Sequence, residues 1–457
     1  MTENRKTNHK VLFFVENARL FRTTLIGNLY EVAQAYQTVL MLGRNDPEIN
    51  KALSNKRFFP KLEKVIFFET AFGKKILTKN KKLYKLQKDI IKSYEPDIII
   101  THNDLSPASL YLLRFGKKTG ALNIVLQAGF KLGRAEETAK YFYLSSAYLK
   151  WPFFIPLTIR VFFVSMKKYL GHFLYFWILP LTVGEFPFLG KSSSILMKGK
   201  SGMRDSDYSA VFSKREKDIC LEDGVPEEKL CVLEHPLLRK DSRKIFEETF
   251  FLKKISKIED SKALTLMFPA EAIGFRKGNY SLISIKENQK KRLEIINLIA
   301  SVLGDWKIYI KPHPAVTTLP AKVKKEVEQG FENIRALSKN IIIVDPFDPV
   351  DKYIEMSKVI VGMPPASFSL YTVPLQDPGK IALSLDIEKE VFGDIYKGES
   401  FGEIEYIDSK EKFVSILKLI KENKYYRENK KELKREGFSN TVNLLNYLLK
   451  KKYLKYD

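Results

Sequence analysis

Residues 97–129 read DIIITHNDLSPASLYLLRFGKKTGALNIVLQAG and predict a strand, a helix and a second strand. Asp97–Thr101 and Asn123–Leu126 are short apolar runs, as expected of strands that are buried on both faces. Between them, Ser106–Thr119 has the apolar spacing of a helix and stops at Gly120. A strand–helix–strand unit of this length is typical of a parallel sheet with helices on both faces.

The same alternation continues toward both ends of the chain. Further strands are predicted at Lys10–Glu16, Thr38–Leu42, Val65–Phe68, Tyr208–Phe212, Leu230–Leu233, Ala263–Phe268, Trp306–Ile310, Asn340–Val344, Lys358–Val361 and Lys380–Leu385. Helices are predicted at Thr23–Ala35, Lys81–Tyr94, Ser213–Asp223, Lys286–Leu303, Ala321–Ala336 and Pro349–Met356. The sequence therefore predicts the α/β class, with two Rossmann-like doubly wound domains.

We expect the N-terminal domain to span residues 1–240 and the C-terminal domain residues 263–425. The charged stretch 241–262 is predicted to link them, and residues 426–457 to form a basic C-terminal helix. Ligands of open parallel sheets bind beyond the carboxyl ends of the strands. The residues directly after strands are therefore the candidates for chemistry.

The composition excludes several classes of protein. The 457 residues are 45% hydrophobic, which is too apolar for an intrinsically disordered chain. Cys220 and Cys231 are the two cysteines, too few for a disulfide framework or a four-ligand zinc site. They favour a reducing, cytoplasmic setting. The N-terminus shows no signal-peptide pattern.

The formal net charge of +23 calls for an explanation. Nucleic acid, anionic lipid and phosphorylated small molecules would all complement it. A solvated basic surface is the alternative, because charge runs usually are solvated faces. The sequence has no zinc-finger or RNP-type motif, so we expect no nucleic-acid partner.

Residues 141–190 depart from the α/β pattern. Trp151–Met166 and Tyr169–Val183 are dense in aromatic and aliphatic residues, but prolines and charges interrupt them. Neither reaches the roughly 18–20 apolar residues that span a bilayer. The segment predicts an apolar helical insert that dips into one leaflet of an anionic membrane surface. A helical pair buried in the N-terminal domain is the alternative.

The strongest chemical signal is IYIKPHP at Ile308–Pro314. An apolar strand here delivers Lys311 and His313 to the carboxyl edge of its sheet, between prolines that restrict the backbone. An ammonium and an imidazole together suit a phosphate group. A surface lysine beside a turn histidine is the alternative. Neither the dinucleotide fingerprint nor the P-loop motif is present.

A second signal, VGMPPASFS, follows a neighbouring strand at Val361–Ser369. Gly362 permits close approach of the backbone, and Ser367 and Ser369 place hydroxyl groups near a helix start. A helix N-terminus with free N–H groups is an anion site. Simple N-capping by Ser367 is the alternative. Taken together, the two signals predict one phosphate-binding pocket.

These motifs resemble those of the GT-B glycosyltransferases of surface and capsular polysaccharide assembly. The similar enzymes are sialyltransferase-like and CDP-glycerol glycerophosphotransferase-like, with a His-Pro motif and a serine motif. Asp97–Gly129 is similar to the family's strand–helix–strand that ends in Gln-His-Gly, although Ala128 stands where histidine is common. Gly224–Pro236 looks like the family's turn and strand before the linker.

The resemblance implies roles for individual residues. His313 would contact the donor phosphate and protonate the leaving group, Lys311 would neutralise its charge, and Ser367 and Ser369 would hold the same phosphate. The nucleotide-sugar donor is a co-substrate, so no cofactor is implied. No metal is implied either, because positive side chains and helix N–H groups can replace one. A CMP-, CDP- or UDP-linked donor and an inverting reaction are expected.

The base that activates an acceptor hydroxyl is expected in the N-terminal domain. Glu16 follows the first strand, and His102 and Asp104 follow the strand Asp97–Thr101. A carboxylate or imidazole there could accept the proton. A structural role is the alternative for each, with Asp104 as a helix cap. Glu271 follows the first strand of the second domain and is a candidate for contacting the donor sugar.

The leading hypothesis is a cytoplasmic glycosyltransferase, attached peripherally to the inner face of the cell membrane. It would transfer a sugar or polyol phosphate from the donor to a surface glycan or lipid-linked acceptor. A UDP-sugar 2-epimerase on the same fold is the alternative, and it needs neither acceptor nor membrane. The resemblance also predicts that the basic helices after Lys410 fold back on the N-terminal domain or reach anionic lipid.

Overall fold

The computed structural model divides the chain into two compact units. Unit 1 lies within Met1–Glu137, Ser165–Leu252 and Arg435–Asp457, and unit 2 within Thr138–Val164 and Lys253–Lys434. The structure describes residues 9–69, 76–104, 106–127, 159, 166, 169–171, 173–185, 205–236, 239–249, 262–268, 282–313, 316–317, 321–348, 350–363, 370, 373, 379–385, 404–425 and 437–454.

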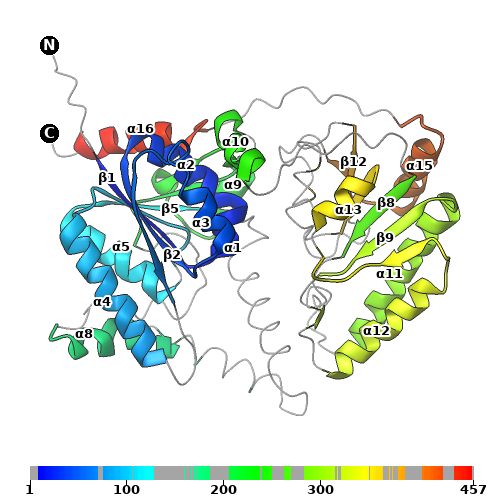
Figure 1. The fold of residues 1–457 in the computed structure, drawn as a ribbon, viewed down its shortest axis with the longest axis horizontal. Helices are drawn as coiled ribbons and strands as arrows, with labels where there is room; N and C mark the ends of the chain where they lie inside the picture. The colour runs from blue at the N-terminus through cyan, green and yellow to red at the C-terminus, as the bar shows by residue number, and fades with distance from the viewer. Residues whose placement is uncertain are drawn as a thin grey trace. The chain divides into compact units, whose positions relative to one another are not determined.

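Unit 1 contains a parallel sheet with the strand order β3-β2-β1-β4-β5-β6-β7 (Figure 1). The strands are β1 (Lys10–Val15), β2 (Gln37–Gly43), β3 (Leu62–Phe68), β4 (Ile98–Thr101), β5 (Leu122–Leu126), β6 (Tyr208–Val211) and β7 (Leu230–Val232). The helices are α1 (Ala18–Leu20), the π-helical turn η1 (Phe21–Leu25), α2 (Ile26–Ala35), α3 (Pro47–Leu53), α4 (Ile76–Tyr94), α5 (Pro107–Thr119), η2 (Leu174–Ile178), α8 (Leu179–Thr182), α9 (Lys214–Glu222), η4 (Glu227–Lys229), α10 (Lys240–Thr249) and α16 (Thr441–Tyr453).

Unit 2 repeats this topology in the order β10-β9-β8-β11-β12-β13, also all parallel. The strands are β8 (Ala263–Met267), β9 (Lys307–Lys311), β10 (Ile341–Ile343), β11 (Val359–Gly362), β12 (Ile381–Leu385) and β13 (Glu405–Ile407). The helices are α11 (Leu282–Val302), α12 (Ala321–Arg335), α13 (Val350–Met356) and α15 (Lys410–Lys421). The expected fold class, two doubly wound α/β domains, is confirmed.

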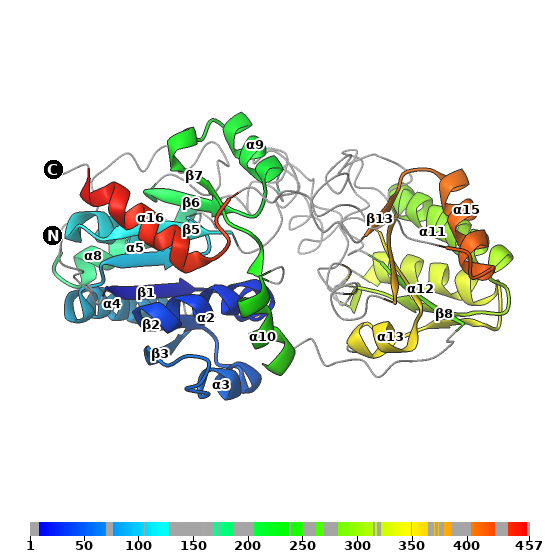
Figure 2. The ribbon, with the colours of Figure 1, turned by 90° about the horizontal axis from the view of Figure 1, so that it is seen from above.

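Helices cover both faces of each sheet (Figures 1 and 2). In unit 1, Leu12, Phe14 and Met41 point from the sheet into a core completed by α4, α5 and η2. In unit 2, α11, α12 and α15 bury one face, while α13 packs on the other. Side chains on successive residues of a strand point to opposite faces, so an inner strand such as β1 is apolar on both faces, whereas the edge strand β3 exposes Glu63 and Lys64.

The described part of the apolar insert contributes to the core of unit 1. Leu174, Tyr175, Phe176 and Leu179 are buried there against α4 and α5. Leu181 is exposed, and most of residues 141–190 lie outside the described residues. None of the described helices is both long and apolar enough to cross a bilayer. Membrane attachment stays a prediction.

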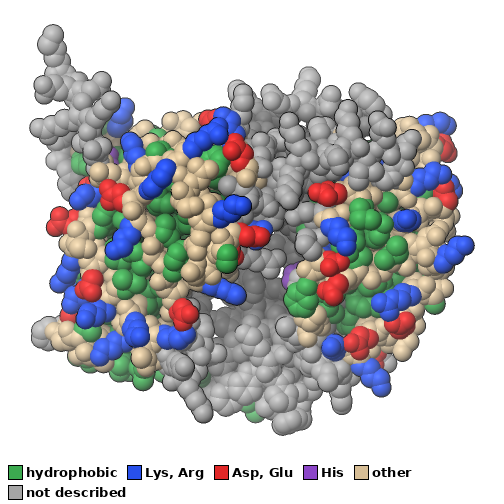
Figure 3. Space-filling view, viewed as in Figure 1, with side chains coloured by type: hydrophobic (Ala, Val, Ile, Leu, Met, Phe, Trp, Pro, Cys, Tyr) green, Lys and Arg blue, Asp and Glu red, His purple; other side chains and the backbone are tan. Residues whose placement is uncertain are grey.

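The described basic side chains are dispersed over both units. On the face shown in Figure 3, Lys and Arg alternate with Asp and Glu, and the described side chains form no single basic patch there. Among the terminal helices, α16 packs on α2 of unit 1, as predicted. The same prediction was wrong for α15, because Phe413, Leu417 and Ile420 bury it in the core of unit 2.

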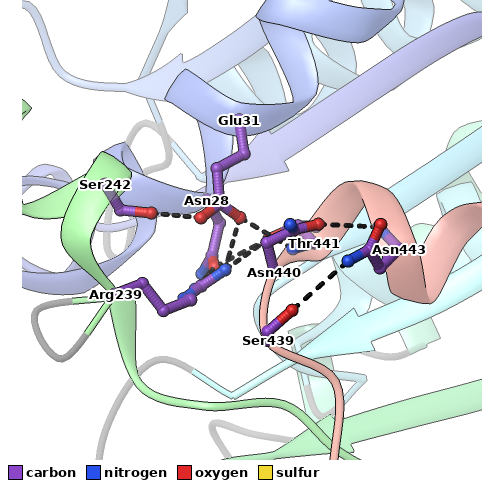
Figure 4. Close-up of polar contacts among 8 residues, drawn as sticks. All are labelled: Asn28, Glu31, Arg239, Ser242, Ser439, Asn440, Thr441 and Asn443. Atoms are coloured by element: carbon purple, nitrogen blue, oxygen red, sulfur yellow. Dashed lines mark hydrogen bonds and ion pairs between the residues drawn. The ribbon is translucent and has the colours of Figure 1, made fainter.

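A buried polar cluster joins three segments of unit 1 (Figure 4). The Arg239 guanidinium donates to Glu31 and Asn28 on α2, and to Thr441 Oγ1 at 3.1 Å. The Ser242 hydroxyl on α10 donates to Glu31, and the Thr441 N–H donates to Glu31 Oε2 at 2.7 Å. We call these five residues the clasp. It anchors the chain to α2 where it leaves for unit 2 and where it returns.

Removing the clasp arginine is expected to loosen α16. In Arg239→Ala the Glu31 carboxylate loses its buried ion-pair partner, and breaking such a pair costs about 3–5 kcal/mol. Hydrogen–deuterium exchange of α16 should accelerate by about a hundredfold or more. The control is Lys244→Ala on α10, where the side chain is exposed. Unchanged exchange in Arg239→Ala would show that the clasp contributes little.

Candidate functional site

Each sheet has one topological switch point, the place where the strand order reverses. In unit 1, β1 lies between β2 and β4, and the chain leaves β1 and β4 in opposite directions across the sheet. In unit 2, β8 and β11 have the same relationship. Crevices for ligands form at these points in doubly wound folds. Glu16 and His102 directly follow β1 and β4, so both predicted residues stand at the switch point of unit 1.

Glu16 is a half-buried carboxyl group beside the start of α5. The Ser109 hydroxyl donates to Glu16 Oε2 at 3.4 Å. Burial raises the pKa of Glu16, while hydrogen bonds from Ser106, Asn103 and Ser109 partly oppose the rise. A carboxyl group with a raised pKa is a better proton acceptor than an ordinary surface glutamate.

His102 is held by its neighbour in one tautomer. The Asn103 side-chain oxygen accepts from the Ser106 N–H at 2.9 Å, so its NH₂ group faces His102 Nε2 at 2.7 Å. Because that group only donates, Nε2 accepts and the ring proton lies on Nδ1. Burial lowers the pKa of His102 to about 4. The imidazole is therefore neutral at pH 7.

Asp104 differs from the other two candidates because its side chain is fully buried. The N-cap of α5 is Ser106, whose Oγ accepts from the Ser109 N–H at 3.0 Å, so the alternative role of Asp104 as a helix cap is wrong. The other two candidates, His102 and Glu16, are connected by Asn103, which contacts His102 and hydrogen bonds to Glu16. The catalytic roles themselves stay predictions.

A pocket of about 400 Å³ opens beside Glu16, at the carboxyl ends of β1 and β2. Arg22, Gly43 and Arg44 line it as well. The sequence reasoning missed these three, although Gly43 and Arg44 stand directly at the end of β2. The rule that singled out Glu16 after β1 would have found them.

In unit 2, Lys311 stands at the end of β9 and is buried. Its ammonium donates to the backbone carbonyls of Pro346 at 2.6 Å, Asp345 at 3.3 Å and Pro312 at 3.4 Å. Burial lowers the pKa of Lys311. These bonds tie the ends of β9 and β10 together, so Lys311 has a structural role, while its predicted contact with a phosphate stays a prediction.

The other predicted donor residues are only partly described. His313 is half-buried, and its carbonyl accepts from the Val316 N–H at 3.0 Å. Gly362 ends β11 between Met267 and Ser384 at the switch point. Ser367, Ser369 and Glu271 lie outside the described residues. Among the described residues, no group of His, Cys, Asp or Glu is arranged to hold a metal ion.

No family model matches this sequence, and no curated protein matches it. Solved structures do match. The UDP-GlcNAc 2-epimerase from Neisseria meningitidis bound to UDP-GlcNAc is 14% identical, with a TM-score of 0.51 over 96% of this chain and 100% of that one. A protein from Listeria monocytogenes assigned to the UDP-N-acetylglucosamine 2-epimerases is 11% identical, with a TM-score of 0.53 over 99% and 98%.

A third match is the lipopolysaccharide outer core galactosyltransferase WaaB, 14% identical, with a TM-score of 0.44 over 92% of each chain. At these identities the two epimerase matches show the fold alone. Together with the two parallel sheets of equal topology, they define the class: this chain has the two-domain GT-B fold.

The pH dependence of stability should report the buried His102. A lowered pKa means that the unfolded chain binds this proton more tightly, so the wild type loses stability as the pH falls from about 6.5 to about 4. The loss is about 3 kcal/mol. His102→Gln should lack it, as measured by urea unfolding at pH 7 and pH 4. Parallel pH profiles for the two proteins would contradict this assignment.

Replacing the buried lysine should destabilise unit 2. In Lys311→Met, the partly buried carbonyls of Asp345 and Pro346 lose their charged donor, and a hydrogen bond to a charged group contributes about 1.5–3 kcal/mol. Urea unfolding measures the loss. Lys307→Met, at the exposed start of the same strand, is the matched control. Equal stabilities of the two variants would exclude the structural role.

Proposed function

We propose that this chain is a GT-B glycosyltransferase. It transfers a sugar or polyol phosphate from a nucleotide-activated donor to a surface polysaccharide or lipid-linked acceptor. The observation that carries the proposal is Glu16, a carboxyl group with a pKa raised by burial, at the switch point of unit 1 and beside a pocket. We assign the acceptor to unit 1 and the donor to unit 2.

For transfer of a sugar, the reaction we propose is a single displacement at the anomeric carbon. Glu16 takes the proton of the acceptor hydroxyl as its oxygen bonds to that carbon. The bond between the carbon and the donor phosphate oxygen breaks at the same time, and its electron pair stays on the phosphate. This order of events inverts the configuration. Neutral His102 has a positioning role. It accepts a hydrogen bond from Asn103, and Asn103 in turn hydrogen bonds to the Glu16 carboxyl group and keeps it in place.

His313 is assigned to the leaving phosphate. It follows β9, and its backbone is fixed by the bond from Val316. Its imidazolium form can donate to the phosphate as negative charge develops there. The ammonium of Lys311 lies on the adjacent carbonyls and supplies a fixed positive charge near this edge of the sheet. No metal is part of the proposed mechanism.

A UDP-sugar 2-epimerase is the second candidate. The Neisseria meningitidis enzyme of this fold has been solved with UDP-GlcNAc, which favours testing UDP-linked sugars first. The two activities differ in one requirement: an epimerase converts its UDP-sugar without an acceptor. Turnover of UDP-GlcNAc alone, followed by NMR of the sugar protons, would select the epimerase. Nucleotide release that depends on an added acceptor would select the transferase.

The His313 role is tested by His313→Ala. Loss of a general acid lowers turnover by roughly 10²–10⁴-fold, and we expect a fall of that size in nucleotide release. The wild type should first be screened for thermal stabilisation by CMP, CDP, UDP and GDP, because ligand binding to the folded state raises the melting temperature. Lys324→Ala, an exposed lysine on α12, is the control.

Two outcomes would contradict the proposal. Turnover of His313→Ala within a few-fold of the wild type would remove the assigned role of that histidine. Absence of stabilisation by all four nucleotides would remove the assignment to nucleotide-sugar chemistry. An unchanged melting temperature of His313→Ala without ligand shows that any loss of turnover is not a loss of fold.

A further inference from the structure

The pocket in unit 1 is large enough to hold a sugar ring. Its volume of about 400 Å³ is near the lower end of small-molecule sites, which run from roughly 300 to 1,000 Å³. It lies at the carboxyl ends of β1 and β2, with Glu16 in its wall.

The backbone around this pocket is tightly constrained. A Cβ atom on Gly43 would lie 2.2 Å from the carbonyl oxygen of Glu16, so only glycine lets the two strand ends approach in this way. Arg44 follows with φ at +79°, a left-handed conformation that is unfavourable for a side chain with a Cβ. On the other wall, Arg22 belongs to the π-helical turn η1. Both irregularities are typical of ligand sites.

Most charges at the pocket already have partners within the protein. Asp46 Oδ1 accepts from the N–H groups of Glu48 at 3.0 Å and Ile49 at 3.2 Å, as the N-cap of α3. Arg22 pairs with Glu48 Oε2 at 2.5 Å. Arg44 is exposed, and its guanidinium makes no ion pair or side-chain hydrogen bond with any residue that the structure describes.

We propose that this pocket binds an anionic sugar unit of the acceptor, with its carboxylate or phosphate on Arg44 and a hydroxyl group facing Glu16. This inference rests on the proposed function. A guanidinium offers parallel N–H groups that match a carboxylate or a phosphate. A neutral sugar would make no ion pair with the Arg44 guanidinium. The selected acceptors are therefore glycans that contain uronic acid, sialic acid or phosphorylated sugars.

The test is a ligand-observed NMR titration of the full chain. Three probes are used: methyl β-glucuronide, glucose 6-phosphate and the neutral methyl β-glucoside. The wild type should bind at least one anionic probe at least tenfold more tightly than the neutral one. Arg44→Gln should lose about tenfold or more of the anionic affinity and keep the neutral affinity. Lys51→Gln, an exposed lysine on α3, should match the wild type.

The probes also separate the two sources of charge. Preference for the glucuronide identifies a uronic-acid-type acceptor, and preference for the phosphate identifies a phosphorylated one. Equal binding of charged and neutral probes would overturn the inference, as would an Arg44→Gln variant that retains the preference. An equal loss in Lys51→Gln would also overturn it, because it would show attraction by the general surface charge.

Failure of this inference can be told apart from failure of the proposed function. Nucleotide stabilisation is assigned to unit 2 and does not involve Arg44. If nucleotides stabilise the chain but the charged probes bind no better than the neutral one, the anionic site is wrong and the function stands. If Arg44 selects anionic sugars but no nucleotide binds, the site stands and the transferase assignment is wrong.

Discussion

The hydrogen bonds of the Glu31 carboxylate hold together three segments of unit 1, including the two from which the chain leaves for unit 2 and to which it returns. The carboxylate accepts from the Arg239 guanidinium, the Ser242 hydroxyl and the Thr441 N–H, and all of these groups are buried. These three donors fix the position of the Glu31 carboxylate, while Asn28 Nδ2 and Arg239 Nε of the same cluster are buried without a hydrogen-bond partner among the described residues. Because the cluster holds α10 and α16 on α2 together, the chain can leave unit 1 after α10 and return at α16 without releasing either helix. An isolated helix as short as α16 is marginal in water, so its position derives from this anchoring and from Leu444 and Leu448 beneath it.

The fold was largely predictable because strands in a parallel sheet are buried on both faces. The sequence KVLFFV of β1, like those of the other inner strands, is therefore a continuous apolar run. Few other types of secondary structure need such a run. The failures have equally physical causes. β13 is a short strand at the edge of its sheet and is only partly buried, so its residues carry little apolar signal. α10 was predicted to be part of the linker because most of its residues are charged or polar, although Ile245 and Phe246 are buried and the helix packs on α2. The position of α15 depends on partners in unit 2 that lie far away in sequence.

The site was predictable where a residue follows a strand, and less so where its partners are distant. Glu16 and His102 were found by that rule, and Arg44 could have been. No pattern in the sequence predicts that Lys311 donates to the carbonyl of Asp345, more than thirty residues later, or that Asp104 is buried. These properties follow from the close packing of strand ends, which brings together loops that are separated along the chain. A lysine that follows a strand can therefore either contact a ligand phosphate or bind backbone carbonyls. Only the burial of its ammonium group in the structure distinguishes these two interpretations.

Burial gives the switch point of unit 1 its electrostatic character. It raises the pKa of Glu16 and lowers that of His102, so both groups are shifted toward their neutral forms. At the adjacent pocket, the guanidinium of Arg44 is exposed and makes no ion pair with any of the residues that the structure describes. On the proposed function, Arg44 would bind the anionic group of the acceptor sugar, and one of the hydroxyl groups of that sugar would face Glu16. Arg44 would then recognise the charge of the acceptor, while the ionised form of Glu16 would take the proton of that hydroxyl group. A pKa raised by burial makes this carboxylate, once ionised, a stronger base than the carboxylate of an exposed glutamate.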